Sequence, residues 1–329
     1  MGTMASATFP LAPRARPIVT LTVNPALDIS TSTAQVITDH KMRCGSSRID
    51  PGGGGVNVAR TIQSLGGDAL AIYAAGGLTG ATYRQLLEAE NVPSLVVPIA
   101  GTTRESFTVD EGASGAQFRF VLQGPEFTEA EWRRCLAALE EAIVPGGYVV
   151  ASGSLPPGVP ADFYAQVARL AHQRGARSII DTSGEALTAA LAEGVYLVKP
   201  SLRELSELVG RELTTEQSEV DAAAELVARG SAQLVALTLG DQGAVLASTA
   251  GVIRLPVPHV QVQSAVGAGD AFLGAFVWRL SQGRDPESAF RSAVCAGSAT
   301  AAKPATEMCA IAEVEALEKL LPVATRYEL

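Results

Sequence analysis

Short apolar runs alternate with longer amphipathic segments along the chain from residue 18 onward. Apolar runs of this length that also carry β-branched residues are typical of strands buried on both faces, and apolar residues spaced every three to four positions are typical of helices. We expect strands at 18–23, 69–74, 148–151, 178–181, 196–198 and 233–239. We expect helices at 56–65, 81–90, 129–143, 161–172 and 220–229. The alternation predicts an α/β fold: a central, mostly parallel sheet flanked by helices on both faces, with ligands at the carboxyl ends of the strands.

Two stretches, about 29–50 and 104–122, interrupt this alternation and contain no convincing helix. In the second, residues 106–110 and 117–122 flank a turn at 111–115, which indicates a hairpin. Strands inserted in this way must pack outside the main sheet. We therefore expect a small β-sheet lid over the active cleft, and an exposed apolar face on that lid would require a second subunit.

Composition narrows the class of protein. The 329 residues are 47% hydrophobic and 18% charged, so the chain can bury a large core. The net charge is −9 with no Lys/Arg-rich run, which argues against a nucleic-acid or membrane partner. Four scattered cysteines and three histidines argue against a zinc site or a disulfide framework. With no apolar run of about 20 residues, we expect a cytoplasmic protein with a leader at 1–17 and a single domain at 18–329.

The strongest chemical motif begins at Ser264 and reads SAVGAGDAFLG. Glycines in this motif let the backbone turn tightly as an amphipathic helix begins near Asp270. The backbone amides of Gly267, Ala268 and Gly269 would cradle a phosphoryl group, and Asp270 would accept a proton from an attacking hydroxyl. The alternative is an ordinary helix cap after a glycine-rich turn.

A second group of residues suits a sugar. Asp28, at the end of the first predicted strand, can accept hydrogen bonds from two hydroxyl groups. The four consecutive glycines at 52–55 include Gly53 and Gly54, whose amides a ligand can approach closely. Asn57 follows on the first turn of a predicted helix and can bind another hydroxyl. A turn aspartate, a flexible turn and a surface asparagine are the alternatives.

Lys41, Arg43 and Arg104 lie on the two predicted lid segments. Cations that converge over a cleft in an acidic protein suit a substrate phosphate, and arginine can bind it in bidentate fashion. Ordinary solvated lid charges are the alternative for any one of them.

Taken together, the motifs resemble those of the ribokinase-like sugar kinases, the PfkB family. VGAGDAF at 266–272 resembles a signature of that family, and NPALD at 24–28, PGGGGVNVAR at 51–60, LVKP at 197–200 and TLGDQG at 238–243 follow in the family's order and spacing. The resemblance covers about 18–321 and implies a ribokinase-like fold. The start LTVNPALD at 21–28 is similar to the phosphosugar branch, and Gly54, where 1-phosphofructokinases and tagatose-6-phosphate kinases usually have Lys or Arg, resembles the minor-type ATP-dependent 6-phosphofructokinases.

This resemblance implies an activity. We expect ATP-dependent transfer to the 1-hydroxyl of fructose 6-phosphate, giving fructose 1,6-bisphosphate, with Asp270 as general base. Tagatose-6-phosphate kinase, 1-phosphofructokinase and, more remotely, a non-catalytic sugar-phosphate sensor are the alternatives. The resemblance also implies ATP and Mg²⁺ as cofactors, K⁺ in some relatives, and a homodimer formed through the lid.

The resemblance also assigns roles to further residues. Arg104 is the preferred phosphate ligand, Ser152 belongs to the sugar side, and Lys41 and Arg43 could act across a dimer. The residues expected on the nucleotide side are Lys199, Ser201, Thr238, Gly240, Gly243 and Ser298. Glu204 would bind Mg²⁺ through water, with Ser201 standing where the family generally has asparagine. A monovalent cation would bind through backbone carbonyls near Ser264, Val266 and Thr300.

Overall fold

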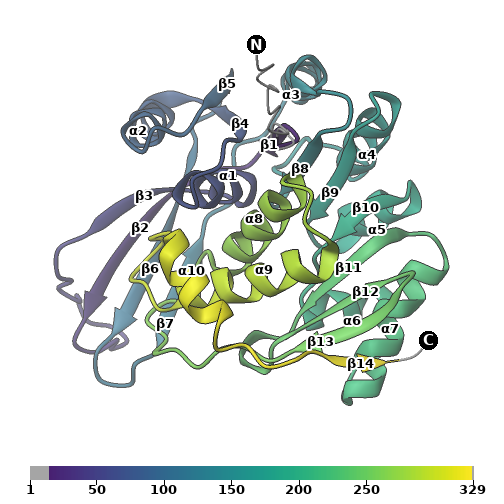
Figure 1. Ribbon diagram of the computed structural model, residues 1–329. Coiled ribbons are helices and arrows are strands. Elements are labelled where there is room, and N and C mark those ends of the chain that lie inside the picture. Colours follow the sequence, from purple (N-terminus) through teal and green to yellow (C-terminus); the bar gives the residue numbers. More distant parts are fainter. Residues whose placement is uncertain (1–14, 328–329) are drawn as a thin grey trace, which may run out of the picture.

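The structure is a computed structural model that describes residues 15–327. A sheet of ten strands runs through the molecule in the order β14-β13-β12-β11-β10-β9-β8-β1-β4-β5 (Figure 1). Its strands are β1 (Ile18–Thr22), β4 (Leu70–Ala75), β5 (Ser94–Pro98), β8 (Tyr148–Ser152), β9 (Arg177–Asp181), β10 (Val195–Val198), β11 (Ala232–Thr238), β12 (Ala244–Ser248), β13 (Gly251–Leu255) and β14 (Thr325–Tyr327). Pairing is parallel from β5 to β11, whereas β12, β13 and β14 are antiparallel. The predicted mostly parallel α/β sheet is therefore confirmed.

Helices cover both faces of the sheet, so there are two hydrophobic cores. One face packs against α1 (Gly54–Ser64), α2 (Gly77–Ala89), α8 (Ala268–Ser281), α9 (Pro286–Ala301) and α10 (Ile311–Glu318). The other face packs against α3 (Glu129–Ala142), α4 (Phe163–Gln173), α5 (Gly184–Ala192), α6 (Leu202–Val209) and α7 (Glu216–Ala228). A short 3₁₀ turn, η1 (Gly240–Gln242), links β11 to β12.

Four strands form a second sheet, the lid, in the order β3-β2-β6-β7. They are β2 (Ala26–Thr33), β3 (Arg48–Gly52), β6 (Arg104–Glu111) and β7 (Gln117–Val121). The lid projects to one side of the main sheet (Figure 1). The predicted hairpin is confirmed as β6 and β7, but β2 begins three residues before the predicted lid segment.

That early start corrects the predicted position of Asp28. Strand β1 ends at Thr22, and Asp28 lies within β2 rather than at the end of the first strand. The run Val23–Asp28 therefore crosses from the main sheet into the lid, and the lid strand carries the carboxylate.

Of the predicted leader, residues 1–14 lie outside the described residues. The last part of it joins the fold: the Arg16 amide donates to the Ser281 carbonyl over 2.9 Å, and the Pro17 carbonyl accepts from the Tyr148 amide over 2.8 Å. Within residues 15–327, no helix combines the length and apolar character needed to cross a membrane.

Candidate active site

A cavity of about 310 Å³ lies where the lid meets the carboxyl ends of the central strands. Its walls come from lid strands β2, β6 and β7, from the ends of β8 and β9, and from the first turns of α1 and α8. Predicted site residues Asp28, Gly53, Gly54, Asn57, Arg104, Ser152, Glu204, Val266, Gly267 and Asp270 all line this cavity. The fold thus brings the predicted sugar side and the predicted phosphoryl-transfer motif into one space.

Asp270 stands in the first turn of α8. Gly267 is the N-cap residue with φ 79°, a left-handed conformation that a side chain would strain, and α8 begins at Ala268. The first amides of a helix have no partner within the helix, so this turn presents N–H groups next to the Asp270 carboxylate. The structure therefore places these helix-terminal amides and the Asp270 carboxylate side by side. Their roles as phosphoryl cradle and base stay predictions.

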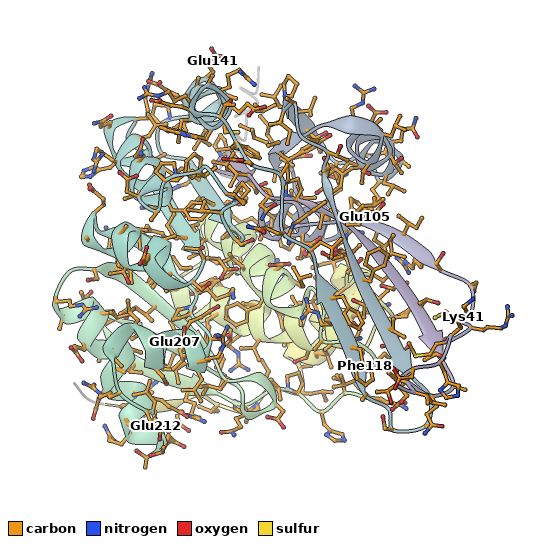
Figure 2. The ribbon with its side chains drawn as sticks, turned by 180° about the vertical axis from the view of Figure 1, so that it is seen from behind. Lys41, Glu105, Phe118, Glu141, Glu207 and Glu212 are labelled. Carbon is orange, nitrogen blue, oxygen red and sulfur yellow. The ribbon has the colours of Figure 1, made fainter. Side chains whose placement is uncertain are left out.

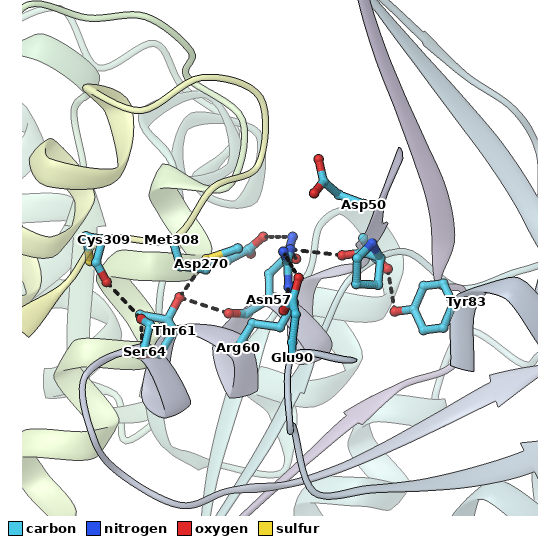
Figure 3. Close-up of polar contacts among 12 residues, drawn as sticks. Asp50, Asn57, Arg60, Thr61, Ser64, Tyr83, Glu90, Asp270, Met308 and Cys309 are labelled. Atoms are coloured by element: carbon cyan, nitrogen blue, oxygen red, sulfur yellow. Dashed lines mark hydrogen bonds and ion pairs between the residues drawn. The ribbon is translucent and has the colours of Figure 1, made fainter. Parts of the chain in front are cut away.

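Asn57 contacts this carboxylate directly. Its side-chain amide donates to Asp270 Oδ2 over 2.9 Å (Figure 3). Asn57 is on the first turn of α1, because that helix begins at Gly54. An amide N–H donated to a carboxylate stabilises the ionised form, so this contact with Asn57 lowers the pKa of Asp270.

Asp181, at the end of β9, is a charged residue of the cavity to which the sequence analysis gave no role. Its Oδ1 lies 3.1 Å from Lys199 Nζ, and its Oδ2 accepts a hydrogen bond from Ser152 over 3.1 Å. Burial opposes the charge on Lys199, but Asp181 and Asp270 outweigh it and raise the pKa of this ammonium. Lys199 therefore stays charged beside the expected phosphoryl-transfer position.

The pKa of the Asp270 carboxyl lies close to neutral pH. Burial raises its pKa to about 7, and the nearby charge of Asp181 adds to this effect. Lys199 and the Asn57 amide act in the opposite direction. A base whose pKa is near the working pH combines enough ionised form with enough proton affinity, which is the condition general-base catalysis requires.

Asp28 lies on the lid wall of the cavity. Burial raises its pKa to about 6, because this effect outweighs that of the nearby cations. Arg104 and Arg119 are the two strongest of those cations. Two nitrogens of Arg104 donate to the backbone carbonyls of Asn24 and Leu122, and its Nε is buried with no partner among the described residues. A carboxylate for hydroxyls and two guanidinium groups for an anion therefore share the lid side of the cavity.

Alternation along the lid strands explains why these side chains converge. Asp28 pairs with Ser106, and Ser106 pairs with Val121, two positions beyond Arg119. Residues directly opposite each other, and residues two apart on one strand, share a face of a sheet. Arg119 was missed as a site residue in the sequence analysis. Combining this alternation with the predicted hairpin would have found it.

The glycine-rich loop packs tightly against the site. A β-carbon at Gly52 would lie 2.0 Å from Asp28 Oδ2, and one at Gly54 would lie 2.1 Å from Ser152 Oγ. Neither position has space for a side chain. These close contacts with Asp28 and Ser152 account for glycine at both positions. The predicted approach of the glycine amides to a sugar stays a prediction.

On the predicted nucleotide side, Ser201 is the N-cap of α6. Its hydroxyl accepts from the Glu204 amide over 3.3 Å, and Glu204 Oε2 accepts from the Ser201 amide over 2.8 Å. Thr238 contacts the Pro200 carbonyl over 3.4 Å, which brings the end of β11 beside this cap. Gly240 and Gly243 both have positive φ in the turn after β11. The predicted loops for ATP thus lie together, beyond Lys199.

Ser298 and the expected monovalent-cation residues lie on or next to α9. The Ser298 hydroxyl donates to the Val294 carbonyl over 3.0 Å, so it is engaged within the helix. The Ser264 hydroxyl accepts from the Val266 amide over 3.2 Å. The Thr300 hydroxyl is buried and contacts the Cys309 thiol, where burial raises the pKa of that thiol and the Thr300 contact lowers it.

Lys41 and Arg43 are not brought to the cavity. Both are exposed in the loop between β2 and β3, and Figure 2 shows Lys41 at the far edge of the lid. Within one subunit these two cations contribute nothing to the cavity wall. Their predicted action across a dimer stays a prediction.

Comparisons with known proteins agree with this geometry. Residues 22–312 match the model of the pfkB family carbohydrate kinases. The chain is 47% identical to the ATP-dependent 6-phosphofructokinase isozyme 2 of Mycobacterium tuberculosis, over 91% of this chain and 88% of that protein. It is 44% identical to the enzyme of the same name from Escherichia coli K12, over 89% of this chain and 94% of that protein.

Solved structures of phosphofructokinase-2 from E. coli superpose closely. The complex with fructose-6-phosphate gives a TM-score of 0.88, at 42% identity over 93% of this chain and 99% of that chain. A complex with potassium gives 0.89, and a tetrameric inhibited form gives 0.87, with the same identity and coverage. The protein belongs to the pfkB family of carbohydrate kinases, and its fold is ribokinase-like.

Proposed function

We propose that this protein is an ATP-dependent 6-phosphofructokinase, which phosphorylates the 1-hydroxyl of fructose 6-phosphate to give fructose 1,6-bisphosphate. The observation that carries this proposal is the placement of Asp270 beside the first amides of α8, in one cavity with Asp28 and the two lid arginines. The relatives that share 47% and 44% of their residues with this chain carry this name. The substrates of such an enzyme are made in the cytoplasm, where we place the protein.

Each part of the substrate has a matching group. Arg104 and Arg119 suit the 6-phosphate because guanidinium groups bind phosphate oxygens in bidentate fashion. Asp28, the amides near Gly53 and Gly54, and Asn57 suit the sugar hydroxyls. This leaves the 1-hydroxyl to face Asp270, which lines the cavity from the first turn of α8.

The transfer step then follows from the residues present. Asp270 accepts the proton of the 1-hydroxyl while the hydroxyl oxygen forms a bond to the γ-phosphorus of ATP. The bond from that phosphorus to the β–γ bridging oxygen breaks, which releases ADP. The first amides of α8, at Ala268 and Gly269, would stabilise the charge on the transferring group. Lys199, fixed by Asp181, adds a positive charge on the same side.

The nucleotide would bind beyond Lys199. Its supports are Ser201, Thr238, Gly240, Gly243 and the segment around Ser298. Mg²⁺ usually binds substrate phosphates and water together with one or two carboxylates. Glu204, which lines the cavity, fits that role through water, because one of its oxygens is already used by the cap of α6. Bound Mg²⁺ would neutralise phosphate charge. For K⁺, backbone carbonyls near Ser264, Val266 and Thr300 are the proposed ligands. The Ser264 amide donates to the Ala301 carbonyl over 3.1 Å, which brings the segment before α8 to the end of α9.

We also propose a homodimer formed through the lid. Cross-strand pairing aligns Ile49, Ile29, Phe107 and Phe120 in one row, on the face opposite to Asp28. Phe120 is 55% exposed and Ile49 is 43% exposed. A continuous apolar sheet face of this kind suits a second copy of the chain. The tetrameric form solved for the E. coli relative makes further association of dimers an outcome to test.

Light scattering with size-exclusion chromatography tests the dimer. We expect the wild-type protein to elute as a dimer and Phe120→Glu to shift toward monomer. Leu78→Glu is the matched control, because Leu78 is 88% exposed, belongs to α2 and is not part of this apolar row. A monomeric wild-type protein would refute the dimer, and a wild-type tetramer that dissociates in Phe120→Glu would extend it.

The activity is tested with a coupled ADP-release assay using ATP, Mg²⁺ and a panel of sugars. The panel contains fructose 6-phosphate, fructose 1-phosphate, tagatose 6-phosphate, fructose and adenosine. We expect the highest kcat/KM for fructose 6-phosphate. A higher value for another sugar would reassign the substrate, and sugar-phosphate binding without any turnover would favour a sensor.

A further inference from the structure

Arg60 lies one helical turn beyond Asn57 on α1, and its side chain is only 3% exposed. It lines no wall of the cavity. Its NH1 nevertheless donates to Asn57 Oδ1 over 3.1 Å. A chain of contacts therefore runs from Arg60 through Asn57 to Asp270 (Figure 3).

This contact decides which way the Asn57 amide points. Asparagine carries an acceptor oxygen and a donor nitrogen on one rotatable group, whereas arginine offers donors only. Because Arg60 donates to the oxygen, the nitrogen must turn toward Asp270. The reversed amide would place an N–H against a guanidinium N–H and an oxygen against a carboxylate, and both contacts would be repulsive.

Arg60 is itself held firmly. Its Nε and NH2 donate to the two carboxylate oxygens of Glu90 over 2.6 and 2.7 Å, and its NH1 also donates to the Pro51 carbonyl over 3.0 Å. Glu90 caps the end of α2, and Pro51 belongs to lid strand β3. The guanidinium is thus fixed from two elements outside α1, and bidentate pairing of this kind restricts its orientation.

We propose that Arg60, anchored by Glu90, is a positioning residue for phosphoryl transfer, which locks the Asn57 amide so that it donates to Asp270 and keeps that carboxylate ionised and oriented. This inference rests on the proposed role of Asp270 as base. It assigns a function to the arginine of the GGGGVNVAR run.

The fixed orientation of the Asn57 amide has a specific electrostatic consequence. The charged groups that face Asp270 are Asp181 from β9, Lys199 beyond β10 and Asp28 from β2, and Glu204 of α6 lines the same cavity. Asp181 and Asp28 favour protonation, and Lys199 and the Asn57 amide oppose it. If Asn57 is free to rotate, one of the two opposing effects is lost and the base titrates at higher pH.

The test measures kcat and KM against pH for Arg60→Met, with the best sugar of the panel. We expect the acidic limb of kcat to move up by about one pH unit and kcat at pH 7 to fall about fivefold, with KM changed less than about threefold. Arg60→Lys, which keeps a donor for Asn57, should recover part of the shift. In an Asn57→Leu background, Arg60→Met should change kcat by less than about twofold and should leave the acidic limb in place. The reason is that the contact between Asn57 and Asp270, which Arg60 controls, is already absent.

Arg254→Met is the matched control. Arg254 also forms a buried ion pair, with Glu219 over 2.6 Å, but it lies on β13 away from the cavity. We expect it to lower the melting temperature without moving the pH limb. If Arg60→Met moves only the melting temperature, or if its effect persists fully without Asn57, Arg60 is merely structural and the proposal is wrong. A wild-type protein with no kinase activity would instead overturn the proposed function.

Discussion

Lys199 Nζ lies 3.1 Å from Asp181 Oδ1, and both side chains are largely buried, at 8% and 14% exposed. Asp181 is the last residue of β9, and Lys199 directly follows the neighbouring strand β10. They have opposite effects on Asp270: Asp181 raises the pKa of that carboxyl, and Lys199 lowers it. The pair therefore fixes a positive charge beside Asp270, the proposed base, whose pKa of about 7 lies near neutral pH.

The first prediction concerns the pH dependence of activity. A base must be ionised to act, so kcat/KM should fall below the pKa of Asp270, which is about 7, and fall more steeply below about 6, where Asp28 protonates. Initial rates from pH 5 to 9 at constant ionic strength measure this profile. A flat profile between pH 6 and 8 would be inconsistent with Asp270 as the base.

Replacing Asp270 tests its proposed role as the base. Asp270→Asn keeps the shape of the side chain but cannot accept a proton, so kcat should fall by about 10²–10⁴-fold. Binding of fructose 6-phosphate, measured by calorimetry, should change little, because Asp28 and the lid arginines are untouched. Near-normal turnover in this variant would eliminate Asp270 as the base.

Asp270→Asn should lower activity but raise the stability of the fold. In the folded protein the pKa of Asp270 is about 7, against 3.8 in the unfolded chain, so the folded state binds more protons between these values. Asp270 therefore destabilises the fold increasingly as pH rises through this range. We expect Asp270→Asn to melt on the order of a few degrees higher than wild type at pH 8, with almost no difference at pH 4. A lower melting temperature at pH 8 would show that the ionised carboxylate stabilises the fold.

Arg119 should bind the substrate phosphate. Arg119→Met removes this charge from an exposed strand, so we expect KM for fructose 6-phosphate to rise about tenfold or more while the melting temperature stays unchanged. Arg133→Met, which removes an exposed arginine paired only along α3, serves as the control and should leave KM as it is. An unchanged KM in Arg119→Met would place the phosphate elsewhere.

The glycine-rich loop offers a steric test. Gly54→Ala places a methyl group against Ser152 Oγ, so the loop or β8 must shift, and we expect kcat/KM to fall about tenfold with some loss of stability. At Gly45 the same change meets only an ordinary contact, 3.5 Å from Ser32 Oγ, and should have no effect. Equal behaviour of the two variants would mean that the loop has spare room.

Much of the fold could be predicted because the buried strands are continuous apolar runs. The antiparallel strands β13 and β14 were not predicted, because they occupy one edge of the sheet and carry weaker patterns. Asp28 was assigned to the wrong strand, since nothing in the composition marks the point where the chain leaves the main sheet for the lid.

The candidate site was predicted best where glycines and polar residues form a motif. Asp181 carries no motif. Its only signal is a carboxylate at the carboxyl end of a buried strand, which the general position of α/β sites would have supported. Lys41 and Arg43 lie away from the cavity of their own subunit. The sequence could not indicate this, because an irregular loop has no periodicity to show where its side chains point. Their predicted action across a dimer stays a prediction.

The most direct test of the central claim is to identify the product. Wild-type protein and Asp270→Asn are incubated with ATP, Mg²⁺ and fructose 6-phosphate, and the product is examined by ³¹P nuclear magnetic resonance. We predict that the wild-type protein forms fructose 1,6-bisphosphate, with a new phosphate on carbon 1, and that Asp270→Asn forms almost none in the same time. A phosphate on another carbon, or equal product from both proteins, would contradict the account.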